Sequence, residues 1–162
     1  LREGMSVADF GSGIGQYAVA AGKRVGDHGR VYTIEVQKDL LKNIKTAARE
    51  AKLANVDVIW GNIETPHGTK IADGSVDVVI AANVLFQAEN KKALLSEAHR
   101  ILAREGKILL VDWTDSWGGL GPERVSVVTE ASARTLLSEA GFSHERKFSA
   151  GDHHYGIIAR KP

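Results

Sequence analysis

The sequence predicts an α/β fold in which helices cover a mostly parallel sheet. Three observations lead to this expectation. Apolar runs rich in β-branched residues alternate with amphipathic stretches of helical period along most of the chain. The first apolar run breaks into a glycine-rich turn that opens a helix, as in nucleotide-binding βα units. Near the end, two β-prone runs follow one another directly, which predicts a terminal hairpin. With 162 residues, one domain spanning residues 1–162 is expected.

The glycine-rich turn lies in residues 6–15, Ser-Val-Ala-Asp-Phe-Gly-Ser-Gly-Ile-Gly, and an amphipathic stretch from Ile14 to Val25 follows. Glycines permit backbone angles that a side chain would block, and they let a ligand lie against the main chain. A dinucleotide fingerprint needs a third glycine where Gln16 stands, so the pattern here is D-x-G-x-G-x-G instead. A glycine-rich turn that binds no ligand remains the alternative.

The second predicted strand, residues 30–35, ends in an acid. Glu35 lies 20 residues past Gly15. An acid at the tip of the second strand can accept hydrogen bonds from both hydroxyls of a ribose, as in nicotinamide sites. The alternative is a solvated charge at a strand end. Residues 37–53 then place apolar side chains at helical spacing with Lys and Arg opposite, which predicts an amphipathic helix covering the sheet.

Two further strands are expected in the middle of the chain. Residues 55–60 form the third, and Asn62 directly after it is either a ligand-binding residue or a plain turn asparagine. Residues 66–74 are a polar, irregular loop. Residues 75–84 are the fourth strand and its exit, and Asp77 near its start is expected to be structural.

The last third contains two helices and three strands. Asn90 is expected to cap a helix over residues 91–104 that ends at Glu105-Gly106, and residues 107–112 form the fifth strand. A loop follows at residues 114–128. Residues 129–141 then form a helix that Thr129 caps and Gly141 ends, and residues 142–148 and 154–159 form the two strands of the hairpin.

These motifs resemble those of the class I S-adenosylmethionine (SAM) methyltransferases. Asp9-x-Gly11-x-Gly13-x-Gly15 is similar to the family's first motif, D/E-x-G-x-G-x-G. The start of the fourth strand resembles its D-G-S-V-D-V-V run, and residues 94–113 resemble a run typical of small-molecule methyltransferases. The first third also looks like isoaspartyl and tRNA-adenine methyltransferases, whereas the middle is nearer to the type 11 and ubiquinone/menaquinone group. The resemblance implies a Rossmann-like three-layer αβα sandwich with a seven-stranded sheet, order 3-2-1-4-5-7-6 and an antiparallel last strand.

The resemblance also implies SAM as the cofactor. In the family the glycines face its methionine and ribose part, and the first-motif acid helps to hold the turn. Asn62 stands where the family has an acid for the adenine amino group, and the next backbone N–H, that of Ile63, meets a ring nitrogen. The implied cofactor contacts are Asp9, Gly11, Ser12, Gly13, Gly15, Glu35, Val36, Asn62, Ile63, Ala82 and Asn83.

No catalytic residue follows from the sequence. Methyl transfer from a sulfonium mainly requires alignment and exclusion of water, and a base is needed only if the acceptor must lose a proton. Candidate bases near the carboxyl edge are Asp112, Asp115 and His67, with His153 and His154 ranked behind them. The last two are adjacent, so a strand would send them to opposite faces. No group of residues has the spacing of metal ligands, and no metal site is expected.

The acceptor itself cannot be read from the sequence, although a small molecule is expected. Trp113 and Trp117 could stack on a planar acceptor, but Trp113 also fits a place in the sheet edge. RNA or protein as acceptor is left open, and so is the oligomeric state.

Composition narrows the function classes. The formal net charge is +1, which provides no general field for nucleic acid or acidic lipid. The absence of cysteine removes disulfides, thiolate metal sites and cysteine nucleophiles. No apolar run approaches the ~20 residues that a membrane span needs, and no signal segment opens the chain, so no membrane association and a cytoplasmic location are expected.

The expected function is therefore methyl transfer from SAM, with two alternatives. One is a non-catalytic binding or partner subunit of the methyltransferase fold, because little or no N-terminal cap precedes the first strand. The other is a nicotinamide-binding oxidoreductase, against which Gln16 and the terminal hairpin count.

Overall fold

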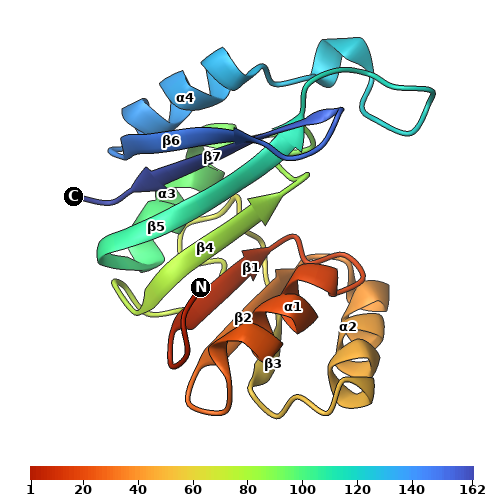
Figure 1. Cartoon of the computed structure of the whole chain (residues 1–162), viewed down its shortest axis with the longest axis vertical. Coiled ribbons are helices and arrows are strands. Elements are labelled where there is room, and N and C mark those ends of the chain that lie inside the picture. Colours follow the sequence, from red (N-terminus) through yellow and green to blue (C-terminus); the bar gives the residue numbers. More distant parts are fainter.

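The computed structural model describes residues 1–162, which form one seven-stranded sheet with four α-helices and a short 3-10 helix (Figure 1). The first half of the chain contains β1 (Ser6–Phe10), α1 (Gln16–Val25), β2 (Arg30–Glu35), α2 (Lys38–Glu50), β3 (Val56–Trp60) and β4 (Val76–Ala82). The second half contains α3 (Lys91–Ile101), β5 (Leu102–Trp113), η1 (Arg124–Ser126), α4 (Glu130–Glu139), β6 (Ser143–Ser149) and β7 (His154–Arg160).

The strand order is β3-β2-β1-β4-β5-β7-β6. Strands β1 to β5 are parallel, whereas β7 runs antiparallel to both β5 and β6. The predicted order and the antiparallel last strand are therefore confirmed. Because the chain reverses direction across the sheet at β1 and β4, the carboxyl ends of these two strands form the crevice where open α/β sheets bind ligands.

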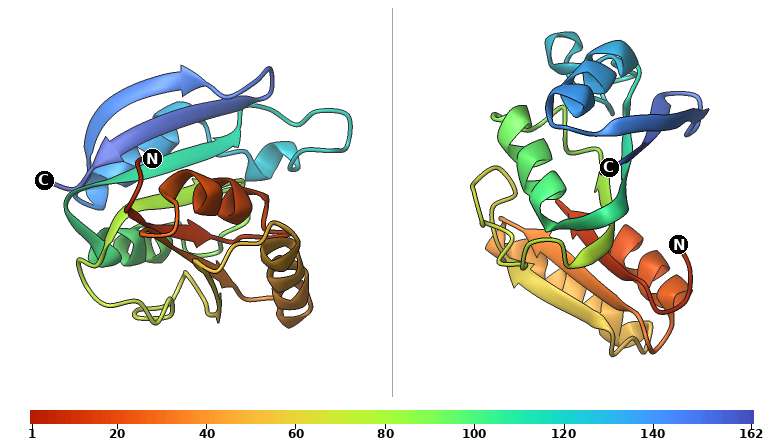
Figure 2. Two further views of the ribbon diagram at one scale, coloured as in Figure 1. Left: turned by 60° about the horizontal axis from the view of Figure 1, so that its bottom comes forward. Right: turned by 90° about the vertical axis from the view of Figure 1, so that its left-hand side faces the viewer.

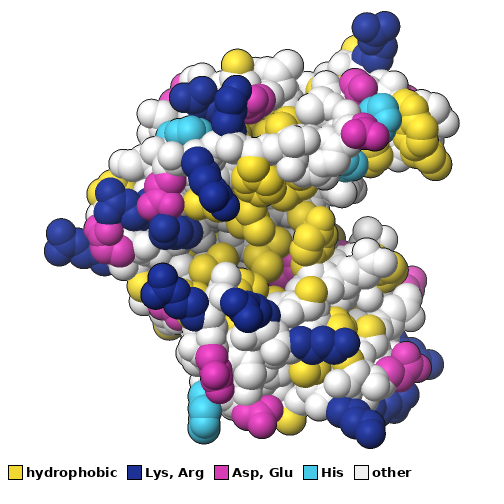
Figure 3. Space-filling view, in the orientation of Figure 1, with side chains coloured by type: hydrophobic (Ala, Val, Ile, Leu, Met, Phe, Trp, Pro, Cys, Tyr) yellow, Lys and Arg dark blue, Asp and Glu magenta, His cyan; other side chains and the backbone are white.

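Helices lie on both faces of the sheet, as the two further views show (Figure 2). On one face α3 and α4 bury the larger core, which contains Leu94, Leu95 and Leu137. On the other face α1 packs on β1 and β2 through Ala18, Ala21 and Val25 and encloses a smaller core. Beyond α1 this second face has no helix over β4, β5 and β7, and apolar side chains gather there in the space-filling view (Figure 3).

Most predicted elements are confirmed to within a few residues. Asn90 caps α3, since its side chain accepts a hydrogen bond from Ala93 N, and Thr129 caps α4 by accepting one from Ser132 N. Asp77 is structural as expected, because its carboxylate accepts a 2.8 Å hydrogen bond from Ser6 N at the start of β1.

The end of α3 was predicted wrongly. The helix stops at Ile101, three residues before the expected position, and Leu102 already belongs to β5. Leu102 is fully buried and pairs with Val76 of β4, so tertiary burial overrides the helical pattern that continues to residue 104. A register shift follows, and Glu105 adopts a φ of 66° within this irregular start of the strand.

The connection from β3 to β4 contains no helix, in agreement with the predicted irregular loop. It is held against α3 by Glu97, which accepts hydrogen bonds from His67 N, Thr69 N and the Thr69 hydroxyl. None of the helices is both long and apolar enough to cross a membrane.

Candidate functional site

The glycine turn after β1 forms the floor of the candidate site. Gly11, Gly13 and Gly15 have φ angles of 65°, 53° and 84°, the left-handed region that side chains rarely adopt. Gly11 N and Ser12 N donate to Ile34 O at 2.9 and 3.3 Å, which ties the turn to β2. A Cβ on Gly11 would lie 2.4 Å from Val84 Cγ1, so the turn approaches the β4 exit as closely as a glycine permits.

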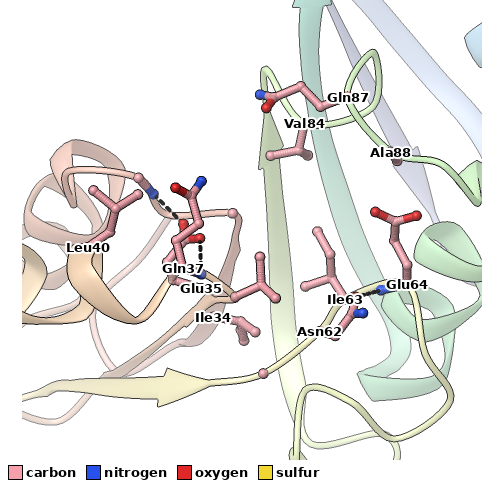
Figure 4. A pocket seen from close by; sticks show the side chains of 14 residues that line it. Ile34, Glu35, Gln37, Leu40, Asn62, Ile63, Glu64, Val84, Gln87 and Ala88 are labelled. Atoms are coloured by element: carbon pink, nitrogen blue, oxygen red, sulfur yellow. Dashed lines mark hydrogen bonds between the residues drawn. The ribbon is translucent and has the colours of Figure 1, made fainter.

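Glu35 at the end of β2 connects the turn to the start of α2. Its carboxylate accepts a hydrogen bond from Gly13 N at 3.0 Å and another from Gln37 N at 2.9 Å (Figure 4). The side chain is 5% exposed, so little water screens it. An ionised carboxylate offers about four acceptor positions, and two backbone donors leave the others for a ligand.

The turn after β3 forms the opposite wall. Asn62 Oδ1 accepts a 2.8 Å hydrogen bond from Glu64 N, which is an Asx turn, so the plain-turn role of this asparagine is present. The backbone N–H groups of Asn62 and Ile63 donate to nothing within the chain and remain free for a ligand. Glu64 in turn accepts a hydrogen bond from Asn90 N at 2.6 Å, joining this wall to the cap of α3.

The exit of β4 closes the third side. Asn83 has a φ of 56° and its buried Oδ1 has no hydrogen-bond partner. Asp112 of β5 stabilises the following segment, because it accepts a 3.1 Å hydrogen bond from Phe86 N. Val84 and Gln87 from this segment face the glycine turn across the cavity (Figure 4).

These segments enclose a cavity of about 280 Å³. Its lining residues come from the ends of β1, β2 and β3 and from the β4 exit: Gly11, Gly13, Ile34, Glu35, Val36, Gln37, Leu40, Gly61, Asn62, Ile63, Glu64, Val84, Gln87 and Ala88. Six of the eleven expected cofactor contacts are among them, namely Gly11, Gly13, Glu35, Val36, Asn62 and Ile63.

The other expected contacts lie outside the lining. Gly15 packs against Ile44 of α2, and a Cβ there would lie 3.3 Å from Ile44 Cγ2. The Ser12 hydroxyl donates to Asp9 O at 2.9 Å and holds the turn from within. Ala82 is buried in the smaller core, and Asn83 lies beyond it at the strand exit.

Asp9 lies beneath the turn and is 1% exposed. Its Oδ2 atom is buried without a hydrogen-bond partner. Burial of the charged form raises the pKa of Asp9 to about 7, although local hydrogen bonds partly oppose this. A buried carboxyl group with an unused acceptor atom is suited to a cationic neighbour.

Residues that the sequence did not indicate line the cavity as well. Gln37 and Leu40 enter because α2 begins directly after Glu35, a closeness visible in the sequence. Gln87 and Ala88 enter because the β4 exit folds back toward the turn, and nothing in their residue types indicates this.

The candidate bases do not gather at the cavity. Asp112 is fully buried, and its oxygens accept hydrogen bonds from Phe86 N and Trp113 N; burial raises its pKa. His67 lies exposed in the β3–β4 loop. Asp115 follows β5 and pairs with His153, whose Nδ1 lies 3.0 Å from the carboxylate.

Fold and site together define a Rossmann-like domain with a cavity at the carboxyl edge of its sheet. Comparison with known proteins specifies the family. A sequence profile described as "Methyltransferase domain" matches residues 1–147, and the chain belongs to that family. It is a SAM-dependent methyltransferase domain of class I, similar to the type 11 group, and SAM is its cofactor.

Relatives and solved structures agree with this assignment. The chain is 32% identical, over its whole length and 78% of the relative, to a probable cobalt-precorrin-6B C(15)-methyltransferase (decarboxylating) of Sulfurisphaera tokodaii. It is 30% identical to an arsenite methyltransferase of Aquipseudomonas alcaligenes, over 69% of the chain and 34% of that protein. A SAM-dependent methyltransferase from Aquifex aeolicus superposes with a TM-score of 0.91 at 26% identity, covering 100% of this chain and 85% of that one.

The quinone-biosynthesis relatives are less similar in sequence and have longer chains. The ubiquinone/menaquinone biosynthesis C-methyltransferase of Shewanella frigidimarina is 28% identical over 70% of this chain, which spans 44% of that protein. The chain therefore covers about a third to a half of the arsenite and quinone relatives.

The residues present fit SAM. A Cβ built on Gly13 would meet no heavy atom within 4 Å, so the space beside the turn is open. Asp9 Oδ2, beneath the turn, and Asn83 Oδ1, at the β4 exit, are buried without a hydrogen-bond partner, and such unused acceptors suit a group that carries positive charge.

Proposed function

We propose that the cavity between the glycine turn and the β3 turn holds SAM, and that the domain transfers its methyl group to a small-molecule acceptor. Glu35 would bind the ribose hydroxyls, and the free N–H groups of Asn62 and Ile63 would bind the adenine edge. Gly11 and Gly13 would lie against the methionine part. Relatives named for a precorrin, arsenite and quinones support a small acceptor.

The observation that carries the proposal is the Glu35 carboxylate. It is buried at the cavity wall, and two backbone amides hold it in one orientation. Such an acceptor is preorganised for a pair of vicinal hydroxyl groups, because its own ordering cost is met before the ligand arrives.

When bound, SAM supplies an electrophilic methyl group on a positively charged sulfur. The contribution of the chain is to bind, to orient and to exclude water, which can account for a large share of the rate enhancement of a displacement. The cavity walls serve this purpose, because Val84 and Ile63 present apolar surface beside polar backbone groups.

Calorimetric titration of the purified chain with SAM, S-adenosylhomocysteine and NAD tests the proposal. Binding of both adenosyl sulfur compounds and no binding of NAD is expected. Binding of NAD alone, or of none of the three, would contradict it.

Gly13→Val should abolish SAM binding, because the side chain would occupy the open space beside the turn. Gly118→Val is the matched control: Gly118 has the same φ of 53° and equally empty surroundings, but it lies in the loop after β5. Both variants meet the same backbone strain, so only the first should lose SAM in the titration. Equal SAM affinity of the two folded variants would show that the turn is wrongly assigned.

A further inference from the structure

A row of basic side chains runs along one side of α2. Its members recur every three or four residues, the spacing that places side chains on the same side of a helix. They are Lys38, Lys42, Lys45, Arg49 and, just past the end of the helix, Lys52. All five are exposed, and none of them forms an ion pair. The two acids of α2, Asp39 and Glu50, lie roughly 100–120° round the helix from the middle of the row. The row therefore carries one sign of charge along its whole length.

This basic row borders a groove between α2 and β3. The groove has a volume of about 350 Å³, and Lys45, Arg49 and Lys52 line it. The rest of its lining is apolar: Ala48, Leu53, Ala54, Val56 and Val58. Strand β3 is the edge of the sheet, so no further strand lies beyond it. In the space-filling view, Lys and Arg side chains gather over the lower end of α2 (Figures 1 and 3).

Trp60 extends the basic surface to the carboxyl end of β3. Its Nε1 donates a 3.0 Å hydrogen bond to Val36 O, which fixes the ring. Lys38 Nζ lies 4.3 Å from the ring centroid, and Lys70 Nζ lies 5.2 Å from it. The ring attracts both ammonium groups without neutralising their charge. Positive charge therefore continues beyond the groove, from Lys52 at one end to Lys70 at the other.

The shape and charge of this surface limit the partner that it fits. A row of unpaired cations favours a ligand with regularly repeated negative charges, because each contact releases a counterion from the ligand. A lipid surface is flat, and the outside of a nucleic-acid duplex is polar, so neither fills a groove with apolar lining. A single strand exposes sugars and bases beside its phosphates, and proteins that bind it use a basic groove along its backbone. The net charge of the whole chain, +1, averages over this local concentration of positive charge.

We propose that the groove between α2 and β3 binds single-stranded nucleic acid. Lys45, Arg49 and Lys52 contact successive phosphates, and the apolar lining contacts sugars and bases. Apart from the three cations the groove contains no polar side chain, so the contacts are independent of base sequence. The groove shares no lining residue with the cofactor cavity, so this inference does not rest on the proposed function.

Fluorescence anisotropy with a labelled oligouridylate of about twelve nucleotides tests the binding. The chain is titrated at several salt concentrations between about 50 and 200 mM. The logarithm of the association constant should fall linearly with the logarithm of the salt concentration. Five cations on five phosphates predict a slope of about −3.5, since each phosphate of a single strand contributes about −0.7.

A triple variant removes the cations that line the groove: Lys45→Gln, Arg49→Gln and Lys52→Gln. At about 50 mM salt it should bind the oligouridylate at least about tenfold more weakly, and its slope should be smaller by about 2, because three phosphate contacts are lost. Its SAM affinity should equal that of the unmodified chain, since none of the three residues lines the cofactor cavity.

A second triple variant is the matched control, because it removes the same charge elsewhere. It replaces three exposed arginines without ion pairs on β5, η1 and β6, beyond β4 from the groove: Arg104→Gln, Arg124→Gln and Arg146→Gln. It should keep most of the affinity and the full slope. Equal losses in the two triple variants would show that only the total charge matters and would overturn the proposal.

Two further probes separate other anionic partners. An oligoglutamate with the same number of charges replaces the oligouridylate in competition, and vesicles that contain phosphatidylserine are used in sedimentation. Neither should bind comparably, because the first has no sugars or bases for the apolar lining and the second is flat. Binding of either probe as tight as that of the oligouridylate, or no binding of the oligouridylate at about 50 mM salt, would overturn the nucleic-acid site. The proposed function is tested separately by the SAM titration.

Discussion

Two buried carboxyl groups near the glycine turn differ in their hydrogen bonding. Glu35 accepts hydrogen bonds from two backbone amides, whereas Asp9 has an oxygen with no partner. Backbone donors stabilise a carboxylate, and burial without donors destabilises it. Glu35 is therefore suited to act as a fixed acceptor, whereas Asp9 is held at an electrostatic cost that a cationic ligand can offset.

Glu35→Ala should weaken SAM binding by about 1.5–3 kcal/mol, the usual contribution of a hydrogen bond to a charged group. The change also frees Gly13 N and loosens the turn. Glu35→Gln keeps an acceptor of the same shape and should lose less. Calorimetry on the three chains provides the comparison, and a loss within error for alanine would show that the Glu35 carboxylate does not bind the cofactor.

Asp9 makes the stability of the fold depend on pH. Its pKa in the fold is about 7 against an ordinary value of 3.8, so the folded chain binds the proton more tightly. The stabilisation is complete below the ordinary value and is lost as the pH rises through 7.

Asp9→Asn removes this dependence. Between about pH 5 and pH 8 the unmodified chain should lose about 2–3 kcal/mol of unfolding free energy relative to the variant. Urea denaturation at the two pH values measures the difference. Asp152→Asn, at an exposed aspartate in the β6–β7 turn, is the control and should show no such change. A constant difference between Asp9→Asn and the unmodified chain would contradict the prediction.

At the scale of elements, the connection from β3 to β4 contains no helix, and side-chain hydrogen bonds hold it against α3. Glu97 on α3 accepts hydrogen bonds from the loop at His67 N and Thr69, and Arg100 reaches both Glu97 and Asp73. Burial alone would raise the pKa of Glu97, but the hydrogen bonds from Arg100 and Thr69 lower it to about 2. The loop is thus held by a buried, charged network that positions the β3 turn of the cofactor cavity.

Glu97→Gln should lower the unfolding free energy by about 2–3 kcal/mol, because charged hydrogen bonds are lost in a buried position. The stabilisation by Glu97 is present above its ordinary pKa of 4.5 and disappears as the pH falls through about 2, so the loss should shrink in acid. Glu139→Gln, which breaks an exposed ion pair with Lys92, should cost less than about 1 kcal/mol. Equal effects in chemical denaturation would contradict the assigned role of the network.

At the scale of the whole molecule, the cavity joins segments that are far apart in the chain. The ends of β1, β2 and β3, and the β4 exit, all contribute walls. A ligand that binds there can do so only when the sheet is assembled, so binding must stabilise the entire fold by mass action.

S-adenosylhomocysteine at about 100 times its dissociation constant should add about 2.7 kcal/mol to the unfolding free energy. For a domain of this size this corresponds to roughly 5–10 °C in Tm. Thermal unfolding followed by circular dichroism measures the shift, with Gly13→Val as the variant that should show none. A similar shift with NAD would contradict the cofactor specificity.

The sequence by itself determined the order and type of the elements, the glycine turn and the acid at the end of β2. These features are local. The periodicity of apolar residues, a glycine at positive φ and the distance between a turn and a strand end all depend on residues that are close in the sequence. The strand order and the cofactor came from resemblance to a family, because no local signal specifies which strands pair.

Only the tertiary structure decided how distant segments meet. Leu102 ends α3 early because it is buried against Val76, and Val84 and Gln87 enter the cavity because Asp112 holds the segment after β4. Asp115 and His153 form a pair because β5 and β7 run antiparallel. Each contact depends on burial and strand pairing between residues far apart in the chain, and the residues next to each partner in the sequence do not indicate such a contact.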